Sequence, residues 1–433
     1  MTAEDRLLQL PRFATDTAAY KPGLDRMRAL LASLGTPHLG LPVVHVAGTN
    51  GKGSTSSLAA SVAGAAGLRV GLHTSPHLLT LRERMRIDGV PAPADWLADA
   101  LDRHGEAIEA GGVSREAGAA SFFEATVALS LLYFADRSVD LAVVEVGLGG
   151  RLDATNVVEP VVSAVTHVGL DHTDLLGETV EEIAVEKAGI ARPGVPFVHA
   201  VEGAASGALE AEARRRGAPV ESVRQSCRVE ALGLGRIRLA TPVRDYGEVE
   251  VGLPGPHQAW NAALAVRAVE VAFAARGAEL SAEAVRLGLA EVVERSGLRG
   301  RGEAWAGDPR VVLDVAHNAD GWRAALGAVD TPGRLWALVG MMADKDARAL
   351  GRALAVHGAR ALAIGLDGDR ALPASALASA LRDEGVPVEV VDGAATALDM
   401  FHQHAEAGDR FLVTGSHQTV AAVLARTPPG SAG

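Results

Sequence analysis

The sequence predicts an α/β protein with two domains, residues 1–295 and residues 296–433. Three observations lead to this fold class. Short apolar runs rich in β-branched residues, such as residues 43–46 and 141–146, are typical of buried parallel strands. Helical patterns of hydrophobic residues separate these runs, as in the βαβ units of a doubly wound sheet. Glycines and arginines over residues 295–301 interrupt this alternation before it restarts, which indicates a linker between domains.

The composition is that of a globular protein and excludes several classes of function. Of the 433 residues, 48% are hydrophobic and 22% are charged. The formal net charge of −12 argues against nucleic acid or an anionic membrane as a partner. The single cysteine, Cys227, excludes an intramolecular disulfide and a cysteine-only metal site. The polar start and the lack of a long apolar run predict neither a signal peptide nor a membrane span, so we expect a cytoplasmic enzyme.

The hydrophobic patterning places the expected elements in order. In the first domain, strands are expected at residues 43–46, 68–72, 141–146 and 161–166, with antiparallel strands within 219–252. Helices are expected at residues 24–34, 54–67, 95–110, 121–136, 179–189, 257–276 and 281–294. The second domain is expected to contain strands at residues 310–315, 334–340, 359–365, 387–391 and 410–414, with helices between them. This second pattern predicts a smaller, Rossmann-like sheet.

A glycine-rich loop follows the first expected strand. Residues 48–54 read Gly-Thr-Asn-Gly-Lys-Gly-Ser and lead directly into a helical pattern. Glycines let backbone N–H groups converge on an anion, and the start of a helix adds a partial positive charge. Lys52 would then neutralise phosphate oxygens, and Ser54 could bind Mg²⁺. The loop therefore predicts a P-loop, although Gly53 separates the lysine from the serine; a plain strand-to-helix turn is the alternative.

Three further polar side chains follow expected parallel strands. Ser75, Glu145 and His172 each lie at the end of such a strand or just after it, so we expect them to meet the glycine-rich loop at one sheet edge. A glutamate at the end of an apolar strand resembles a Walker-B acid. Burying such a carboxylate is costly unless a cation lies beside it. The hydroxyls of Ser54 and Ser75 with Glu145 suit Mg²⁺, and one imidazole is tolerable in a second site. Taken alone, Ser75 could belong to an ordinary turn and His172 to a loop.

Lysine is scarce in this chain. Of the 41 lysines and arginines, only Lys21, Lys52, Lys187 and Lys345 are lysine. A primary amine can act as a compact point charge or be covalently modified, which a guanidinium does not readily do. The four positions are therefore candidates for functions that need an amine. Lys187 lies in a helix that follows His172, although a solvated surface lysine is the alternative there.

The motifs together resemble those of folylpolyglutamate synthase/dihydrofolate synthase, a family of ATP-dependent amide ligases in the Mur ligase superfamily. The resemblance spans nearly the whole chain and rests on residues 48–54, 74–78, 145–156, 171–173, 186–190, 257–262, 314–318, 340–346 and 414–416. In this family, a glycine between Lys52 and Ser54 is the normal form. The resemblance implies a P-loop NTPase-like Mur ligase central domain over residues 1–295, which also holds the folate site, and a smaller Rossmann-like C-terminal glutamate ligase domain.

The resemblance also implies roles for individual residues. Those expected at ATP are Thr49, Asn50, Gly51, Lys52, Gly53, Ser54, Asn261 at the adenine, Asp314 at the ribose and Arg301 at the phosphates. Two Mg²⁺ ions would be held by Ser54, Ser75, Glu145 and His172. Lys187 would be carbamylated, that is N6-carboxylated, to help organise the second ion. Lys52, Lys187, Arg301 and His317 are the expected catalytic residues; this chain has Arg299-Gly300-Arg301 where the family usually has Pro-Gly-Arg.

The substrate site follows in the same way. The resemblance places the pteroate end of the acceptor against Gly23, Leu24, Ser121, Phe122, Phe123, Glu124, Leu152, Asp153 and Ala154. Lys345, between two aspartates, is a candidate clamp for the carboxylates of incoming glutamate, and Ser416 is a second candidate; a surface ion-pair cluster is the alternative for Lys345. The expected partners are ATP, L-glutamate and dihydropteroate or reduced folates, with neither nucleic acid nor membrane, and we expect a monomer.

The implied reaction is amide ligation through an acyl phosphate. A substrate carboxylate attacks the γ-phosphate, while Lys52 and Arg301 offset the negative charge, and the amine of glutamate then attacks the acyl phosphate. Two alternatives remain. A Mur-type peptidoglycan amino-acid ligase would need a further domain for its UDP group, whereas only residues 1–47 precede the loop here. A P-loop ATPase that is not a ligase would leave Ser75, His172, Lys187 and Asp314 without roles.

Overall fold

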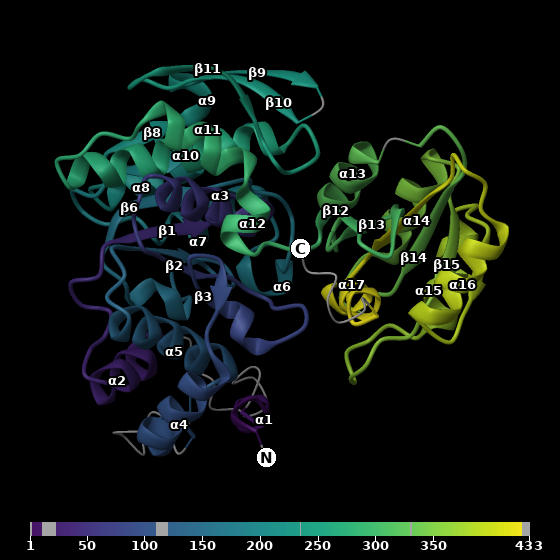
Figure 1. Ribbon diagram of the computed structural model, residues 1–433, viewed down its shortest axis with the longest axis horizontal. Helices are drawn as coiled ribbons and strands as arrows, with labels where there is room; N and C mark the ends of the chain where they lie inside the picture. Colours follow the sequence, from purple (N-terminus) through teal and green to yellow (C-terminus); the bar gives the residue numbers. More distant parts are fainter. Residues whose placement is uncertain (1, 11–22, 110–119, 234, 330, 427–433) are drawn as a thin grey trace. The chain divides into compact units, whose positions relative to one another are not determined.

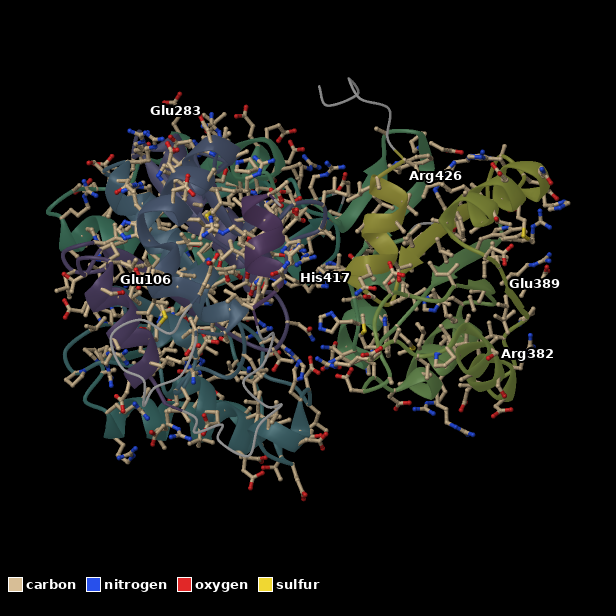
Figure 2. The ribbon with its side chains drawn as sticks, turned by 90° about the horizontal axis from the view of Figure 1, so that it is seen from below. Glu106, Glu283, Arg382, Glu389, His417 and Arg426 are labelled. Carbon is tan, nitrogen blue, oxygen red and sulfur yellow. The ribbon has the colours of Figure 1, made fainter. Side chains whose placement is uncertain are left out.

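The computed structural model describes residues 2–10, 23–109, 120–233, 235–329 and 331–426. The chain divides into two compact units, which Figure 1 draws in the colours of the sequence. Unit 1 contains residues 1–252 and 258–298, and unit 2 contains residues 253–257 and 299–433. The short segment 253–257 thus belongs to unit 2 although its flanks belong to unit 1. Charged side chains such as Glu106 and Glu283 are exposed, and Figure 2 shows Glu283 at the rim of unit 1.

Unit 1 is built on an eight-stranded sheet in the order β4-β3-β2-β5-β1-β6-β7-β8. Its strands are β1 (Val43–Ala47), β2 (Val70–His73), β3 (Met85–Ile87), β4 (Val90–Pro91), β5 (Leu141–Glu145), β6 (Pro160–Val165), β7 (Phe197–His199) and β8 (Val220–Ser222). All neighbouring pairs from β2 to β8 are parallel, whereas β3 and β4 extend the sheet in antiparallel fashion. The four strands expected around the glycine-rich loop are confirmed. Every residue of β1 and β5 is buried, as their apolar sequences predict.

The expectation of antiparallel strands over residues 219–252 is only partly right. Strand β8 is parallel and belongs to the main sheet, whereas β9 (Arg228–Gly233), β10 (Arg236–Ala240) and β11 (Asp245–Glu250) form a separate antiparallel sheet. Strands β3 and β4 were not expected. They contain three and two residues, and a run this short carries too few alternating positions to be recognised.

Helices cover the main sheet of unit 1. They are α1 (Ala3–Leu8), α2 (Asp25–Ser33), α3 (Lys52–Ala65), α4 (Ala94–Glu109), α5 (Phe122–Asp136), α6 (Thr173–Leu176), α7 (Val180–Ala188), α8 (Ala204–Arg215), α9 (Val223–Ser226), α10 (Gln258–Ala275), α11 (Ala282–Ala290) and α12 (Val292–Ser296). The 3₁₀ turns η2 (Leu81–Arg84) and η3 (Ala154–Val157) lie between them. Helix α3 packs against α10, α11 and α12, and α5 contacts β2, β3 and η3.

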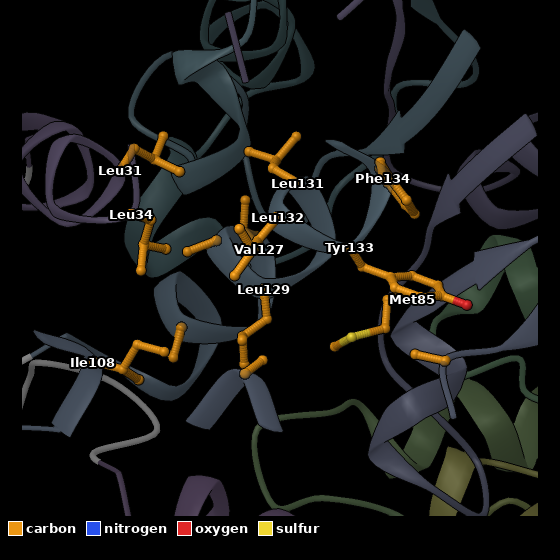
Figure 3. Close-up of a cluster of buried hydrophobic side chains, with 14 of the residues drawn as sticks. Leu31, Leu34, Met85, Ile108, Val127, Leu129, Leu131, Leu132, Tyr133 and Phe134 are labelled. Atoms are coloured by element: carbon orange, nitrogen blue, oxygen red, sulfur yellow. The ribbon is translucent and has the colours of Figure 1, made fainter. Parts of the chain in front are cut away.

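Helix α5 lies in the core of this region and is apolar on nearly all sides. Its side chains meet those of α2, α4 and β3 in one hydrophobic cluster (Figure 3). The labelled members of that cluster are Leu31, Leu34, Met85, Ile108, Val127, Leu129, Leu131, Leu132, Tyr133 and Phe134. Ser121 caps the start of α5 through a capping box with Glu124, which satisfies N–H groups at the polar beginning of this buried helix.

Unit 2 is a six-stranded sheet in the order β12-β13-β17-β14-β15-β16. Its strands are β12 (Arg301–Trp305), β13 (Asp308–Asp314), β14 (Leu335–Val339), β15 (Arg360–Ala363), β16 (Val388–Val390) and β17 (Arg410–Thr414). Its helices are α13 (Ala319–Ala328), α14 (Ala347–Val356), α15 (Ala374–Asp383), α16 (Ala394–His404) and α17 (His417–Leu424). The five expected strands are confirmed as a parallel set, and β12, which was not expected, adds an antiparallel edge.

Among the described residues, no helix is both long enough and apolar enough to cross a membrane.

Two of the histidines that are fully buried in the main sheet of unit 1 have strongly lowered pKa values. His45 in β1 and His73 in β2 are at most 1% exposed. Burial, with smaller contributions from nearby positive charge, lowers the pKa of each imidazole to about 3. Both side chains are therefore neutral in the folded protein at physiological pH, whereas in the unfolded chain they would titrate near the ordinary value of 6.5.

Unit 1 is consequently expected to lose stability as the pH falls from 7 to 5. Because the pKa values are lower in the folded state, the unfolded chain binds protons in this range that the folded chain does not, and the loss is about 2 kcal/mol for each histidine. Denaturant unfolding of the wild type and of the His45→Gln/His73→Asn double variant at pH 7 and pH 5 measures the effect. The variant should lose less stability than the wild type. Equal losses would contradict the claim that the pKa values of His45 and His73 are lowered in the folded protein.

Candidate active site

The loops that follow four neighbouring strands meet at the carboxyl edge of the unit 1 sheet. Strand β1 lies between β5 and β6, and β5 also pairs with β2. The structure brings Ser75 and Glu145 together: the Ser75 backbone N–H donates to Glu145 Oε2 at 3.0 Å. It also joins the glycine-rich loop to the segment after β6, because the Thr49 N–H donates to His167 O at 2.6 Å. The expected convergence at this edge follows from the parallel strand order.

Two glycines shape the glycine-rich loop. Any other residue at either position would have to displace neighbouring atoms. Gly51 precedes α3 with φ +86, and a Cβ there would lie 2.6 Å from Asn261 Oδ1. Gly48 has φ +151, and a Cβ there would lie 1.8 Å from Thr166 Oγ1, whose hydroxyl donates to Asn50 O at 2.7 Å. The loop is thus held against neighbouring segments and leads into the first turn of α3, where the buried Ser54 lies. A glycine-rich loop that leads into a helix start in this way has the shape that suits an anion.

Two lysines share one backbone carbonyl at this loop. Lys52 Nζ donates to Gly48 O and Thr49 O, each at 3.0 Å, and Lys187 Nζ donates to Gly48 O at 3.0 Å. Lys187 is 2% exposed, so it is not the solvated surface lysine of the alternative interpretation. Burial and then the charge of Lys52 lower the pKa of Lys187 to about 7, while Asp171 and other carboxylates oppose the shift. A substantial fraction of Lys187 is therefore a neutral amine near pH 7.

The residues expected to hold metal at this edge are three oxygen donors, Ser54, Ser75 and Glu145, and one imidazole, His172. Glu145 is the last residue of β5 and is 3% exposed, and Ser54 is 2% exposed. His172 has φ +51 and precedes α6, and its N–H donates to Asp171 Oδ1 at 3.0 Å. Among the described residues, no group of three or more histidines, cysteines, aspartates or glutamates could hold a metal by itself. One buried carboxylate with serine hydroxyls fits Mg²⁺, which commonly takes its other oxygens from nucleotide phosphates and water.

Two buried arginines at the same edge were not anticipated. Arg86 of β3 is 5% exposed, donates to Thr74 Oγ1 at 3.2 Å and is close enough to Glu145 for the carboxylate to act on its pKa, which burial lowers. The Arg84 guanidinium lies 5.0 Å from the centre of the Phe122 ring. Both arginines come from β3 or the turn before it, where the sequence resembles a solvated polar segment.

The three segments expected to line the acceptor lie together in unit 1. Gly23 and Leu24 precede α2, whose Arg26 pairs with Glu124 at 2.8 Å at the start of α5. A Cβ on Gly147, at the start of the loop that leads to residues 152–154, would lie 2.3 Å from the Phe123 ring.

The carboxylates of these segments are engaged within the protein. Glu124 accepts from Ser121 and from Arg26. Asp153 is buried, accepts from the N–H groups of Leu148 and Thr155, and has a pKa raised by burial. The sequence did not indicate these internal partners. Both carboxylates are placed to hold the segments in shape.

The residues expected in unit 2 lie at the carboxyl edge of its sheet. Asp314 ends β13 and accepts from Gly302 N and Ala316 N, each at 2.9 Å; burial raises its pKa, and the Arg301 charge opposes that rise. The His317 ring lies 5.8 Å from the ring of His417, which Figure 2 labels and which follows Ser416, the N-cap of α17. Asp314 and His317 therefore lie at and after the end of β13, and Ser416 and His417 follow the adjacent strand β17.

Lys345 lies on the segment that follows β14, the other neighbour of β17. Its Nζ is 3.6 Å from Asp344 Oδ2, and its side chain is 12% exposed. An ion pair with Asp344 is thus present, as the alternative interpretation supposed, but the amine is mostly buried rather than spread on the surface.

Comparisons with known proteins agree with this geometry. Residues 46–269 match the Mur ligase middle domain, and residues 300–417 match the Mur ligase glutamate ligase domain. The dihydrofolate synthase/folylpolyglutamate synthase of Escherichia coli is 34% identical over 416 residues, which cover 93% of this chain and 90% of the relative. The chain belongs to this family of Mur ligases. The corresponding protein of Bacillus subtilis is 41% identical over 310 residues, 70% of each chain.

Solved structures of the dihydrofolate synthase/folylpolyglutamate synthase family have the same fold. E. coli FolC in complex with DHPP and ADP superimposes with a TM-score of 0.83 at 30% identity, covering 98% of this chain and 97% of that one. A bifunctional family member with Mn, AMPPNP and L-glutamate bound gives 0.79 at 31% identity and 94% coverage of both. The chain spans about half the length of two archaeal relatives whose names add a dihydropteroate synthase.

Proposed function

We propose that this protein is an ATP-dependent ligase that forms an amide between L-glutamate and a carboxyl group of dihydropteroate or a reduced folate. The observation that supports this most is the glycine-rich loop with two lysines on Gly48 O, at the sheet edge where Ser75 meets the buried Glu145. A simple ATPase loop has no use for a second, buried lysine with a lowered pKa. Membership in the family supplies the substrate class.

The start of α3 and Lys52 would bind the phosphates of ATP. Lys52 Nζ would exchange its contacts with Gly48 O and Thr49 O for phosphate oxygens, which are stronger acceptors for an ammonium group. With the charge offset in this way, an oxygen of the acceptor carboxylate attacks the γ-phosphorus and ADP leaves. The amine of glutamate then attacks the carbonyl carbon of the acyl phosphate, and phosphate leaves with the carboxylate oxygen.

Ser54, Ser75, Glu145 and His172 would hold magnesium, which supplies positive charge at the phosphates when bound. The burial of Glu145 at a strand end suits this role, because a buried carboxylate gains from a cation. The Ser75 N–H fixes one carboxylate oxygen from the protein side. Two separate ion sites are part of this proposal.

Lys187 is proposed to carry a carbamate. Its neutral amine would attack CO₂ and release one proton, giving an anionic N6-carboxyl group. This change would convert the repulsion between Lys187 and Lys52 into an attraction, and it requires the neutral amine that a pKa of about 7 provides. The roles of Asn261 at the adenine, Asp314 at the ribose, Arg301 and His317 at the nucleotide, and Lys345 and Ser416 at glutamate stay predictions, as does a monomeric state.

An assay with three acceptors tests the proposal. Purified protein with Mg-ATP and labelled L-glutamate is given dihydropteroate, tetrahydrofolate or a UDP-sugar peptide in parallel, and labelled product is separated from free glutamate. We expect product with at least one of the two pterin acceptors and none with the UDP-sugar peptide. Product with the peptide alone would favour a peptidoglycan ligase, and ADP release that does not depend on glutamate would favour an ATPase.

A further inference from the structure

Two buried histidines lie directly beneath the edge that carries the candidate site. His45 of β1 and His73 of β2 both pair in register with Val144 of β5, the residue before Glu145. Residues in one register row of a parallel sheet point to the same face. Both histidines therefore face the side of the sheet on which each finds its hydrogen-bond partner, Thr155 of η3 and Ser130 of α5.

The hydrogen bonds of His73 fix its orientation against α5. Its Nδ1 lies 2.8 Å from Ser130 Oγ, and that hydroxyl donates its proton to Thr126 O at 2.7 Å. The hydroxyl can therefore only accept from His73, so Nδ1 carries the proton. The imidazole held in this way lies against Phe123, with the ring centres 6.2 Å apart. His73 thus supports one of the aromatic side chains expected at the acceptor.

The hydrogen bonds of His45 lead to the other segment of the acceptor site. Its Nε2 lies 2.9 Å from Thr155 Oγ1, and the Thr155 hydroxyl donates to Asp153 Oδ1. The proton of this bond must then lie on Nε2 of the histidine. Asp153 also accepts from Leu148 N at 2.9 Å. The series of hydrogen bonds that begins at His45 therefore ends at the turn of residues 148–155.

The stability of the core does not explain why positions 45 and 73 are histidine. In the part of the chain that the structure describes, His45 Nδ1 and His73 Nε2 are buried without a hydrogen-bond partner. A buried polar atom without a partner costs free energy, and an apolar side chain in these valine-rich strands would avoid that cost. What each histidine provides is one directed N–H bond toward a segment of the acceptor site.

We propose that His45 and His73 are positioning residues that hold the turn around Asp153 and the Phe123 ring in the arrangement that binds the bicyclic pterin end of the acceptor. This inference rests on the proposed function. Neither histidine touches the acceptor. Each acts through a single hydrogen bond, His45 through Thr155 and His73 through Ser130, so that loss of the bond loosens the binding site while the phosphate loop keeps its own contacts.

Steady-state kinetics of paired variants test this inference. His45→Leu and His73→Leu remove the N–H groups and should raise the KM for the acceptor roughly five- to tenfold, the effect of one lost hydrogen bond, with the KM for ATP within about twofold of wild type. His45→Gln retains a donor near the position of Nε2, and His73→Asn retains one near Nδ1. These two variants should recover most of the acceptor affinity.

A third buried histidine provides the matched control. His199 of β7 is as buried as His45, but its Nε2 lies 3.3 Å from Glu210 Oε1 of α8, away from the acceptor segments. His199→Leu should therefore leave the KM for the acceptor unchanged. If a leucine variant at His45 or His73 fails to fold, Thr155→Val and Ser130→Ala break the same bonds from the other side and should raise the same KM.

The outcomes separate this inference from the proposed function. Unchanged acceptor KM in the His45 and His73 variants, or an equal rise in His199→Leu, overturns the positioning role while wild-type ligation stands. A wild-type protein that forms no glutamate-dependent product overturns the proposed function and the inference with it. A rise in acceptor KM that the glutamine and asparagine variants reverse supports the inference, because general loss of packing would not depend on one donor atom.

Discussion

Replacing Lys187 with alanine is expected to lower the rate of glutamate ligation by a factor of about a hundred or more. The substitution removes the amine that would become the carbamate beside Lys52 and Gly48 O. Loss of one preorganised charged group at a phosphoryl-transfer site typically has an effect of this size. The measurement is kcat with saturating ATP, glutamate and acceptor. Addition of acetate or another small carboxylate should restore part of the rate, since it can occupy the space that the lysine leaves.

Two controls make the Lys187 result specific. Lys187→Arg keeps a positive charge but cannot form the carbamate, so it should be inactive and should not respond to acetate. Wild-type protein in ¹³C-bicarbonate should show a carbamate carbon resonance that is lost in Lys187→Ala. Full activity of the alanine variant would refute the proposed role.

Replacing Glu145 with glutamine is expected to have the second large effect on the rate of ligation. Glutamine keeps the shape of the side chain and an oxygen that can accept from Ser75 N, but it removes the charge that would attract Mg²⁺. We expect turnover to fall by about a hundredfold and the Mg²⁺ concentration for half-maximal rate to rise. The measurement is the rate at increasing Mg²⁺ with ATP fixed.

Glu186→Gln is the matched control for Glu145. Glu186 is also a carboxylate of unit 1, but it pairs with Arg151 at 2.7 Å and its side chain is 23% exposed. Its substitution should leave the Mg²⁺ dependence unchanged. A Glu145→Gln variant with wild-type Mg²⁺ dependence would remove Glu145 from the metal site. Thermal unfolding of both variants checks the fold, since Arg86 also lies near Glu145.

The parts of the fold that the sequence predicted are those with a strong local pattern. Strands β1 and β5 were recognisable because a strand covered on both faces is apolar at every position. Strands β3, β4 and β12 were missed although they are antiparallel additions toward the ends of their sheets: β3 and β4 have only three and two residues, and β12 contains the polar residues Arg301 and Glu303. Their pairing is decided by neighbours far along the chain, which a local pattern does not contain.

The same distinction applies to the candidate site. The glycine-rich loop and the meeting of Ser75 with Glu145 were predictable, because loops after parallel strands share one edge. The partners of buried charges were not predictable. Arg86 beside Glu145, and the internal hydrogen bonds of Asp153, depend on distances between segments that are remote in sequence. The scarcity of lysine pointed to Lys187, but its lowered pKa follows from burial and from the nearness of Lys52.

Transfer of oxygen from the acceptor to phosphate tests the central claim most directly. In the acceptor assay, the reacting carboxyl group is labelled with ¹⁸O, and the phosphate released is examined by ³¹P NMR for the isotope shift. The proposed mechanism predicts one ¹⁸O atom in the phosphate for each amide formed, because the carboxylate oxygen that attacks the γ-phosphorus leaves with it. Phosphate without ¹⁸O, released with ADP whether or not glutamate is present, would show that water attacks ATP and would contradict the account.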